Sequence, residues 1–253
     1  MKKVNEIIRK MHYASVLMLL LLSISSHIIA QDSAQIKPAL AAVGTHAIFG
    51  KVDGISIEGM VQSPSNEKTP LQIVCVFEYT DGDVFNTPGS LPPAANGMAH
   101  VDKQLNGLIT ELRKSGKFLG HSLETLLITP PEGTILASKL LIIGLGDRNK
   151  FTPDEMVDVG RIGMREALRL GVSSYTHASD LKDGGYDSPT GLIITNVLTG
   201  AFQAYETELF LQRKNATTVK PMTNLTLLAG QVFYAPSGEA IKAFVSNHKN
   251  NLL

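Results

Sequence analysis

The sequence predicts an α/β protein in which a mixed, mostly parallel central sheet lies between two layers of helices, a three-layer sandwich. Short apolar runs alternate along the chain with segments that have the apolar spacing of amphipathic helices. Several runs are apolar at every position, as strands covered on both faces are. Because strands alternate with helices, helices are expected on both faces of the sheet. The 253 residues are 43% hydrophobic with no net charge, which suits one folded domain.

The strands expected from these runs are, in chain order, residues 47–49, 59–62, 71–77, 123–128, 136–143, 172–178 and 225–229. The first expected helix covers 98–112, with Gly116 as a left-handed cap after it. Thr152, Pro153 and Glu155 form a capping box that begins the second helix, which runs to Gly171. A third helix is expected from Ser188 and Pro189, and a shorter one after Ser237.

The first thirty residues have the features of an export signal. Four basic residues precede a short apolar core at 14–24, and Ala30 is a small residue suited to cleavage before Gln31. The alternative is an uncleaved membrane anchor, since 11–31 carries no Lys, Arg, Asp or Glu. We expect cleavage and a periplasmic or secreted protein. Residues 31–54 then form an N-terminal extension with the first strand, and 55–253 form the domain.

Several motifs occur in the order found in one enzyme family. The segment Leu140-Leu-Ile-Ile-Gly-Leu-Gly146, followed by Phe151-Thr-Pro-Asp-Glu155 and a helix rich in Gly, Arg and Ala, resembles the amino-terminal domain of the cytosol-type leucyl aminopeptidases. Ser115-Gly-Lys-Phe-Leu-Gly120, Glu124-Thr-Leu-Leu127 and Gly200-Ala-Phe-Gln-Ala-Tyr205 resemble other parts of that domain. The resemblance covers roughly 55–245.

The resemblance implies a macro-domain-like fold that lies outside the catalytic centre and helps to hold subunits together. In that family the following domain carries two metal ions and a segment of the type Asn-Thr-Asp-Ala-Glu-Gly-Arg. The printed sequence contains no such segment. The resemblance therefore points to the non-catalytic domain.

No cluster in the sequence is typical of a catalytic or metal centre. A two-metal hydrolase needs several carboxylates that converge on ions about 3.5–4 Å apart. No histidines after residue 30 are paired at metal-ligand spacing; they are His46, His100, His121, His177 and His248. Cys75, the only cysteine, lies in an apolar run that should bury it and raise the pKa of its thiol. We expect no catalytic residue, no metal and no cofactor.

Two loops are candidate ligand sites. Gly144, Gly146 and Asp147 follow an apolar strand, where glycines let backbone amides approach a phosphate, although a tight strand-to-helix turn is the favoured explanation. Asp183, Gly184 and Gly185 form the second loop. In a macro-like fold both loops could line a crevice at the strand ends, where open α/β sheets bind ligands.

The balanced charge offers no surface for a phosphate backbone, so no nucleic-acid partner is expected. We expect binding or assembly rather than peptide hydrolysis. Two alternatives stay open: part of a split metal-dependent aminopeptidase whose catalytic half is a separate chain, and a macro-type domain that binds or hydrolyses a small nucleotide-like ligand. Self-association or a partner protein is expected from large apolar residues on the third helix, Phe202, Tyr205, Leu209 and Phe210.

Overall fold

The computed structural model describes residues 40–81, 87–218 and 220–250. The expected export signal lies outside these residues and stays a prediction. The strands are β1 (His46–Val52), β2 (Ile55–Val61), β3 (Gln72–Val76), β4 (Thr125–Ile128), β5 (Leu140–Gly144), β6 (Ser174–His177) and β7 (Asn224–Ala229). The α-helices are α3 (Gly97–Gln104), α4 (Leu108–Lys114), α5 (Glu155–Arg169), α6 (Thr190–Arg213) and α7 (Tyr234–Asn250), with a short 3-10 helix at Pro93–Ala95. Within the described ranges, no helix is long and apolar enough to cross a membrane.

The strands form one seven-stranded sheet in the order β1-β2-β7-β6-β3-β5-β4. The five inner strands pair in parallel, and the edge strands β1 and β4 are antiparallel to their neighbours. All residues of β3 and β5 are buried, as expected of parallel strands covered on both faces. The predicted α/β fold with a mixed, mostly parallel sheet is therefore confirmed.

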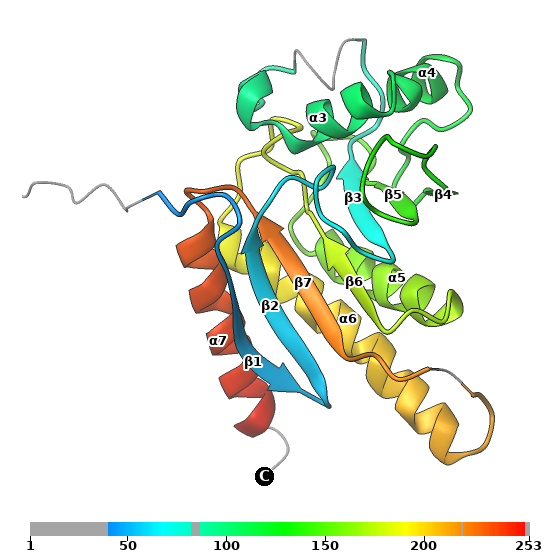
Figure 1. Cartoon of the computed structure of the whole chain (residues 1–253), viewed down its shortest axis with the longest axis vertical. Helices are drawn as coiled ribbons and strands as arrows, with labels where there is room; N and C mark the ends of the chain where they lie inside the picture. The colour runs from blue at the N-terminus through cyan, green and yellow to red at the C-terminus, as the bar shows by residue number, and fades with distance from the viewer. Residues whose placement is uncertain (1–39, 82–86, 219, 251–253) are drawn as a thin grey trace, which may run out of the picture. The chain divides into compact units, whose positions relative to one another are not determined.

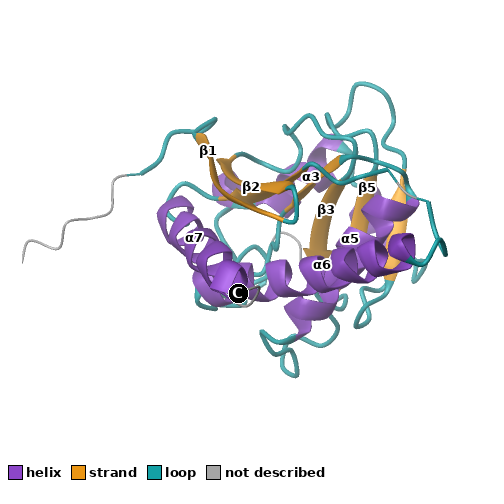
Figure 2. Cartoon of the chain, turned by 90° about the horizontal axis from the view of Figure 1, so that it is seen from below, coloured by secondary structure: helices purple, strands orange, loops and turns teal. Residues whose placement is uncertain are grey.

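Two groups of buried apolar side chains lie on the two faces of the sheet. One group joins the sheet to α5, α6 and α7, and the other joins it to α3 and α4. Figures 1 and 2 show α5, α6 and α7 together along one face of the sheet. The result is a three-layer sandwich. Strand β1 is part of the sheet, so the expected boundary at residue 55 falls at the turn of the β1–β2 hairpin.

Glycines allow α5 and α6 to pack with their backbones in contact. A Cβ atom added at Gly160 would overlap the carbonyl oxygen of Val197, and one added at Gly200 would overlap that of Val157. The two helices therefore approach more closely than larger side chains permit. This contact explains the glycines in two of the motifs that carry the family resemblance.

The prediction of a single helix over 98–112 was wrong, because the chain forms two helices there, α3 and α4. Asn106 and Gly107 have left-handed φ angles of 57° and 81°, which end the first helix. Asp102 of α3 then caps α4, since its carboxylate accepts hydrogen bonds from the backbone N–H and the hydroxyl of Thr110. Helix α7 also begins before Ser237, whose hydroxyl donates to the carbonyl of Phe233 instead of capping.

Two further expectations concern buried side chains. Cys75 is 1% exposed, and burial raises the pKa of its thiol well above the usual value, as predicted. Of the four apolar residues expected to form an interface, Phe202 and Tyr205 lie in the chain's own core and Leu209 packs against it. Only Phe210, at 51% exposure, remains largely at the surface. The expected interface is therefore reduced to Phe210, and self-association stays a prediction.

Candidate ligand-binding crevice

A crevice of about 410 Å³ lies where β2, β7 and β6 end. We call it the strand-end crevice. Its lining includes Val61 of β2, Leu228 and Ala229 of β7, and Ala178, which follows β6. These strands are neighbours and run in the same direction, so their carboxyl ends meet at one edge of the sheet. The volume falls within the range of about 300–1,000 Å³ that is typical of small-molecule sites.

The topology explains why a crevice forms at this edge. Strands β3 and β6 are neighbours, but the chain leaves β3 toward α3 on one face and leaves β6 toward α6 on the other. Connections that depart to opposite faces leave a gap between them, and open α/β sheets bind ligands at such points. The crevice is therefore a consequence of strand order.

The walls of the crevice combine apolar side chains with polar backbone groups. Leu181, Ile193 and Ile194 provide apolar surface. Gly97 at the start of α3, Thr190 at the start of α6, and Phe233 just before α7 also line it. Helix starts carry backbone N–H groups without partners inside the helix and a partial positive charge, so the starts of α6 and α7 favour an anionic group. The start of α3 is already capped, because Met98 N–H donates to Asp183 and Ala99 N–H donates to Asn96.

Lys182 lies beside the starts of α6 and α7. Its ammonium group donates to the Ser188 carbonyl at 3.0 Å and to the Asp187 carboxylate at 2.5 Å, and it lies 5.1 Å from the centre of the Phe233 ring. Because the Asp187 side chain is 98% exposed, the ion pair contributes little energy. Lys182 can therefore exchange Asp187 for an anionic ligand at small cost.

Asp180 and Asp183 join the loop after β6 to β3 and α3. The backbone N–H of Cys75 donates to Asp180 at 3.1 Å, and that of Met98, in the first turn of α3, donates to Asp183 at 3.1 Å. The two carboxyl groups also hydrogen bond to each other. They hold one side of the crevice in place.

Both carboxyl groups have raised pKa values. Burial, together with the charge of Asp183, raises the pKa of Asp180 well above its usual value. Burial also raises the pKa of Asp183, to about 6, although the N–H groups of Met98 and Gly97 oppose the shift. Burial thus disfavours the charged form of both carboxyl groups. Because Asp183 accepts hydrogen bonds from backbone N–H groups, its role in the crevice wall is explained by structure alone.

The structure separates the two loops predicted as ligand sites. Asp183 lines the strand-end crevice, and Gly184 borders a small cavity beside it. Gly185 packs against the Pro88 carbonyl with a left-handed φ of 78°, so it serves the turn.

Gly144, Gly146 and Asp147 lie at the end of β5, on the other side of β3 from β6. The two glycines pack against residues 120–122: a side chain at Gly144 would collide with the His121 carbonyl, and Gly146 lies against Ser122 with a left-handed φ of 71°. Asp147 accepts a hydrogen bond from the backbone N–H of Asn149, which lowers the pKa of its carboxyl. These contacts belong to a tight turn.

Sequence reasoning missed the parts of the crevice that follow β2 and β7. Gln62 and Ser63 come from the first, and Gly230 and Gln231 from the second. The available signal was that both segments directly follow apolar strands. This signal could indicate a shared site only once the strand order was known, because that order places β7 between β2 and β6.

The comparisons with known proteins agree with this architecture. A search of curated proteins found no match. The fold is similar to the Oceanobacillus iheyensis macrodomain with MES bound, with a TM-score of 0.51, 17% identity and coverage of 80% of this chain and 98% of that one. It is also similar to a Trypanosoma brucei macrodomain in complex with ADP-ribose, with a TM-score of 0.51, 16% identity and coverage of 80% and 78%.

A mutant leucine aminopeptidase from tomato is similar as well, with a TM-score of 0.50 and 18% identity. That match covers 76% of this chain and 37% of the tomato protein. The model of the N-terminal domain of the cytosol aminopeptidase family matches residues 73–203, which is more than half of the 253 residues. The chain therefore belongs to the family of cytosol aminopeptidase N-terminal domains.

Proposed function

We propose that this chain is an exported, non-catalytic binding domain that holds a small nucleotide-like ligand in the strand-end crevice. The observation that carries the proposal is the crevice itself, with apolar walls and the starts of α6 and α7 at the ends of parallel strands. An aromatic base suits the apolar walls, and phosphates suit the helix starts and Lys182. A macrodomain of similar fold was solved in complex with ADP-ribose, which makes that compound a suitable first probe.

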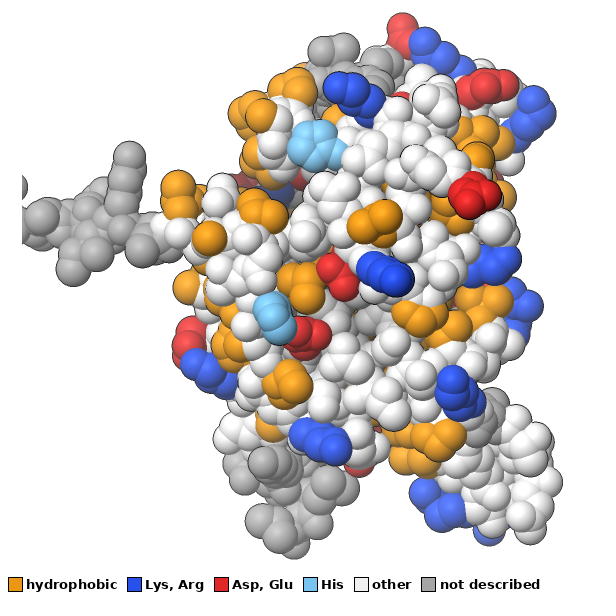
Figure 3. All heavy atoms as spheres, in the orientation of Figure 1, with side chains coloured by type: hydrophobic (Ala, Val, Ile, Leu, Met, Phe, Trp, Pro, Cys, Tyr) orange, Lys and Arg blue, Asp and Glu red, His pale blue; other side chains and the backbone are white. Residues whose placement is uncertain are grey.

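The charge on one face of the molecule supports a small ligand over a polymer. On the face shown in Figure 3, the described acidic and basic side chains are interspersed and form no broad patch of one sign. A nucleic acid would need such a patch for its phosphates. The cation at the crevice, Lys182, suits a single anionic group.

The family match supports binding over peptide hydrolysis. It is to the N-terminal domain of the cytosol aminopeptidase family. A split aminopeptidase, with the catalytic half on a separate chain, is the competing function. It predicts hydrolysis of leucyl amides when that partner is present, whereas our proposal predicts ligand binding by this chain alone.

The test is thermal unfolding and calorimetry of the purified protein with ADP-ribose and ADP. A ligand that binds only the folded state raises stability with concentration, by about 2.7 kcal/mol at one hundred times Kd. Lys182→Met should weaken binding, because it removes the charge and keeps a side chain of similar length. Ala95→Trp should block binding, since Ala95 is exposed and lines the crevice.

Ala216→Trp is the matched control, because Ala216 is exposed in the turn after α6 and does not line the crevice. It should leave binding unchanged. Absence of any stabilisation at millimolar ADP-ribose and ADP, with the protein folded, would contradict the proposal. Equal binding by the wild type and Ala95→Trp would place the ligand elsewhere.

A further inference from the structure

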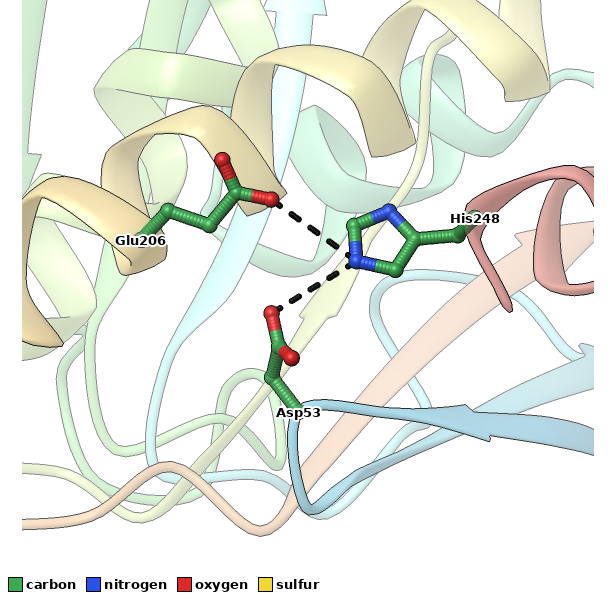
Figure 4. Close-up of side chains that lie close together, drawn as sticks. All are labelled: Asp53, Glu206 and His248. Atoms are coloured by element: carbon green, nitrogen blue, oxygen red, sulfur yellow. Dashed lines mark ion pairs between the residues drawn. The ribbon is translucent and has the colours of Figure 1, made fainter. Parts of the chain in front are cut away.

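A cluster of three side chains lies at the opposite end of the sheet from the crevice. Asp53 is in the turn between β1 and β2, Glu206 is on α6, and His248 is near the end of α7 (Figure 4). The Nε2 atom of His248 lies 3.7 Å from Asp53 Oδ2 and 3.7 Å from Glu206 Oε1. We propose that these residues bind a divalent cation of the zinc class.

The spacing of the three atoms fits a common metal ligand set. All three lie within 4.8 Å of one another. With both histidine distances at 3.7 Å, a point equidistant from the three atoms lies about 2.0–2.4 Å from each. Zinc binds imidazole nitrogen and carboxylate oxygen at about 2.0–2.2 Å. Only small side-chain movements are therefore needed to coordinate the ion.

The His248 ring is held in place by aromatic neighbours. It stacks on Phe244 with ring centres 5.9 Å apart and lies 5.9 Å from the ring of Phe202. Phe202 is itself in the core, so this contact is fixed. The Nε2 atom is buried and has no hydrogen-bond partner among the described residues. Both carboxylates face it from beyond hydrogen-bond distance, as ligands arranged around an ion would.

The charges and ligand types favour zinc over calcium or magnesium. Two carboxylates this close repel each other unless a cation lies between them. A neutral imidazole with two carboxylates neutralises a divalent ion, and imidazole nitrogen is a ligand that Zn²⁺ accepts and that Mg²⁺ and Ca²⁺ seldom take. A groove between α6 and α7, lined by Gln203 and Asn247 among others, borders the cluster and leaves room for a water molecule as fourth ligand.

The metal site does not depend on ligand binding in the crevice, because the two lie at opposite ends of the same elements. Helix α7 begins beside the crevice and ends at the cluster, and β2 runs from Ile55, beside Asp53, to Val61 in the crevice wall. A bound ion would join the β1–β2 turn, α6 and α7. We therefore expect zinc to raise the unfolding temperature of the protein, whether or not the crevice holds a ligand.

The experiment is zinc titration of the full chain, produced without a histidine tag and freed of metal by a chelator. Competition with a fluorescent chelator should show one zinc per chain. Asp53→Asn, Glu206→Gln and His248→Ala should each weaken binding by roughly tenfold or more, with circular dichroism as the test of folding. Glu206 is 51% exposed on a helix, so its substitution should not affect folding.

His46→Ala is the matched control, because His46 also faces a carboxylate, that of Glu58 at 2.7 Å, and should not affect zinc binding. The proposal is overturned if the wild type binds no zinc at micromolar concentration, or if His248→Ala and Glu206→Gln bind as the wild type does. The first result would make the cluster an ion-paired triad only. Displacement of zinc by millimolar Mg²⁺ or Ca²⁺ would overturn the assignment to the zinc class.

Discussion

Replacing Asp183 tests the electrostatics of the crevice wall. Burial raises the pKa of this carboxyl from its ordinary 3.8 to about 6. In the unfolded chain the pKa returns to the ordinary value, so between these two values the folded protein binds more protons than the unfolded chain. The free energy of unfolding therefore falls as pH rises through this window. A difference of about 2 pKa units corresponds to a loss of up to about 3 kcal/mol.

We expect Asp183→Asn to remove most of this loss. The amide has nearly the shape of the carboxyl but does not titrate, and its oxygen can still accept from the Met98 N–H, which lies 3.1 Å from Asp183. Between about pH 4 and about pH 7.5, the variant should therefore gain up to about 3 kcal/mol relative to the wild type. Asp180, whose pKa is also raised, acts in the same direction.

Urea unfolding followed by circular dichroism at several pH values measures the effect. Asp147→Asn is the control, because Asp147 is a loop aspartate whose pKa is lowered by the Asn149 N–H. It should not gain stability over the wild type as pH rises. If the wild type and Asp183→Asn give parallel curves of stability against pH, then burial does not raise the pKa of Asp183 and the account of the crevice wall is wrong.

Four other outcomes are expected. Gly200→Ala should lower the free energy of unfolding by about 1–3 kcal/mol or more, because its Cβ would overlap the Val157 carbonyl; Gly191→Ala on the same helix has room and should not be destabilising in the same urea assay. Cys75 is buried, so it should react with thiol reagents only after unfolding; rapid labelling of the native protein would contradict this. Phe210→Asp should weaken self-association in light scattering without unfolding the chain, whereas a monomeric wild type at high micromolar concentration would leave no interface to weaken. Intact-mass analysis of the exported protein should place its first residue at Gln31, and Met1–Ala30 retained in membranes would instead establish an anchor.

Local patterns predicted most of the secondary structure. The runs of β3 and β5 are apolar at every position, which is enough to identify covered strands. Errors arose where one local signal hid another. The apolar spacing continued across Asn106 and Gly107, although this pair has the left-handed conformation that ends a helix. Ser237 resembled a helix cap because a serine hydroxyl can hydrogen bond to backbone groups both at the start of a helix and within it.

The candidate sites were less predictable. The loop containing Asp183 was identified from its turn residues, and it does line the crevice. The loop containing Gly144 has the same kind of signal but serves a tight turn, because residues 120–122 pack directly against it. A glycine after a strand looks the same in the sequence whether it serves a ligand-binding loop or a tight turn. The segment that packs against it decides which of the two it serves.

By itself the sequence determined the alternation of strands and helices, the burial of Cys75 and the resemblance to the aminopeptidase N-terminal domain. These properties depend on residues close together in the chain. Only the tertiary structure decided the strand order, which brings the ends of β2, β7 and β6 together to form the crevice. It also brought Asp53, Glu206 and His248 within 4.8 Å of one another. The physical reason is that contacts between segments far apart in the chain depend on how strands pair and helices cross, and no local spacing of residues records this.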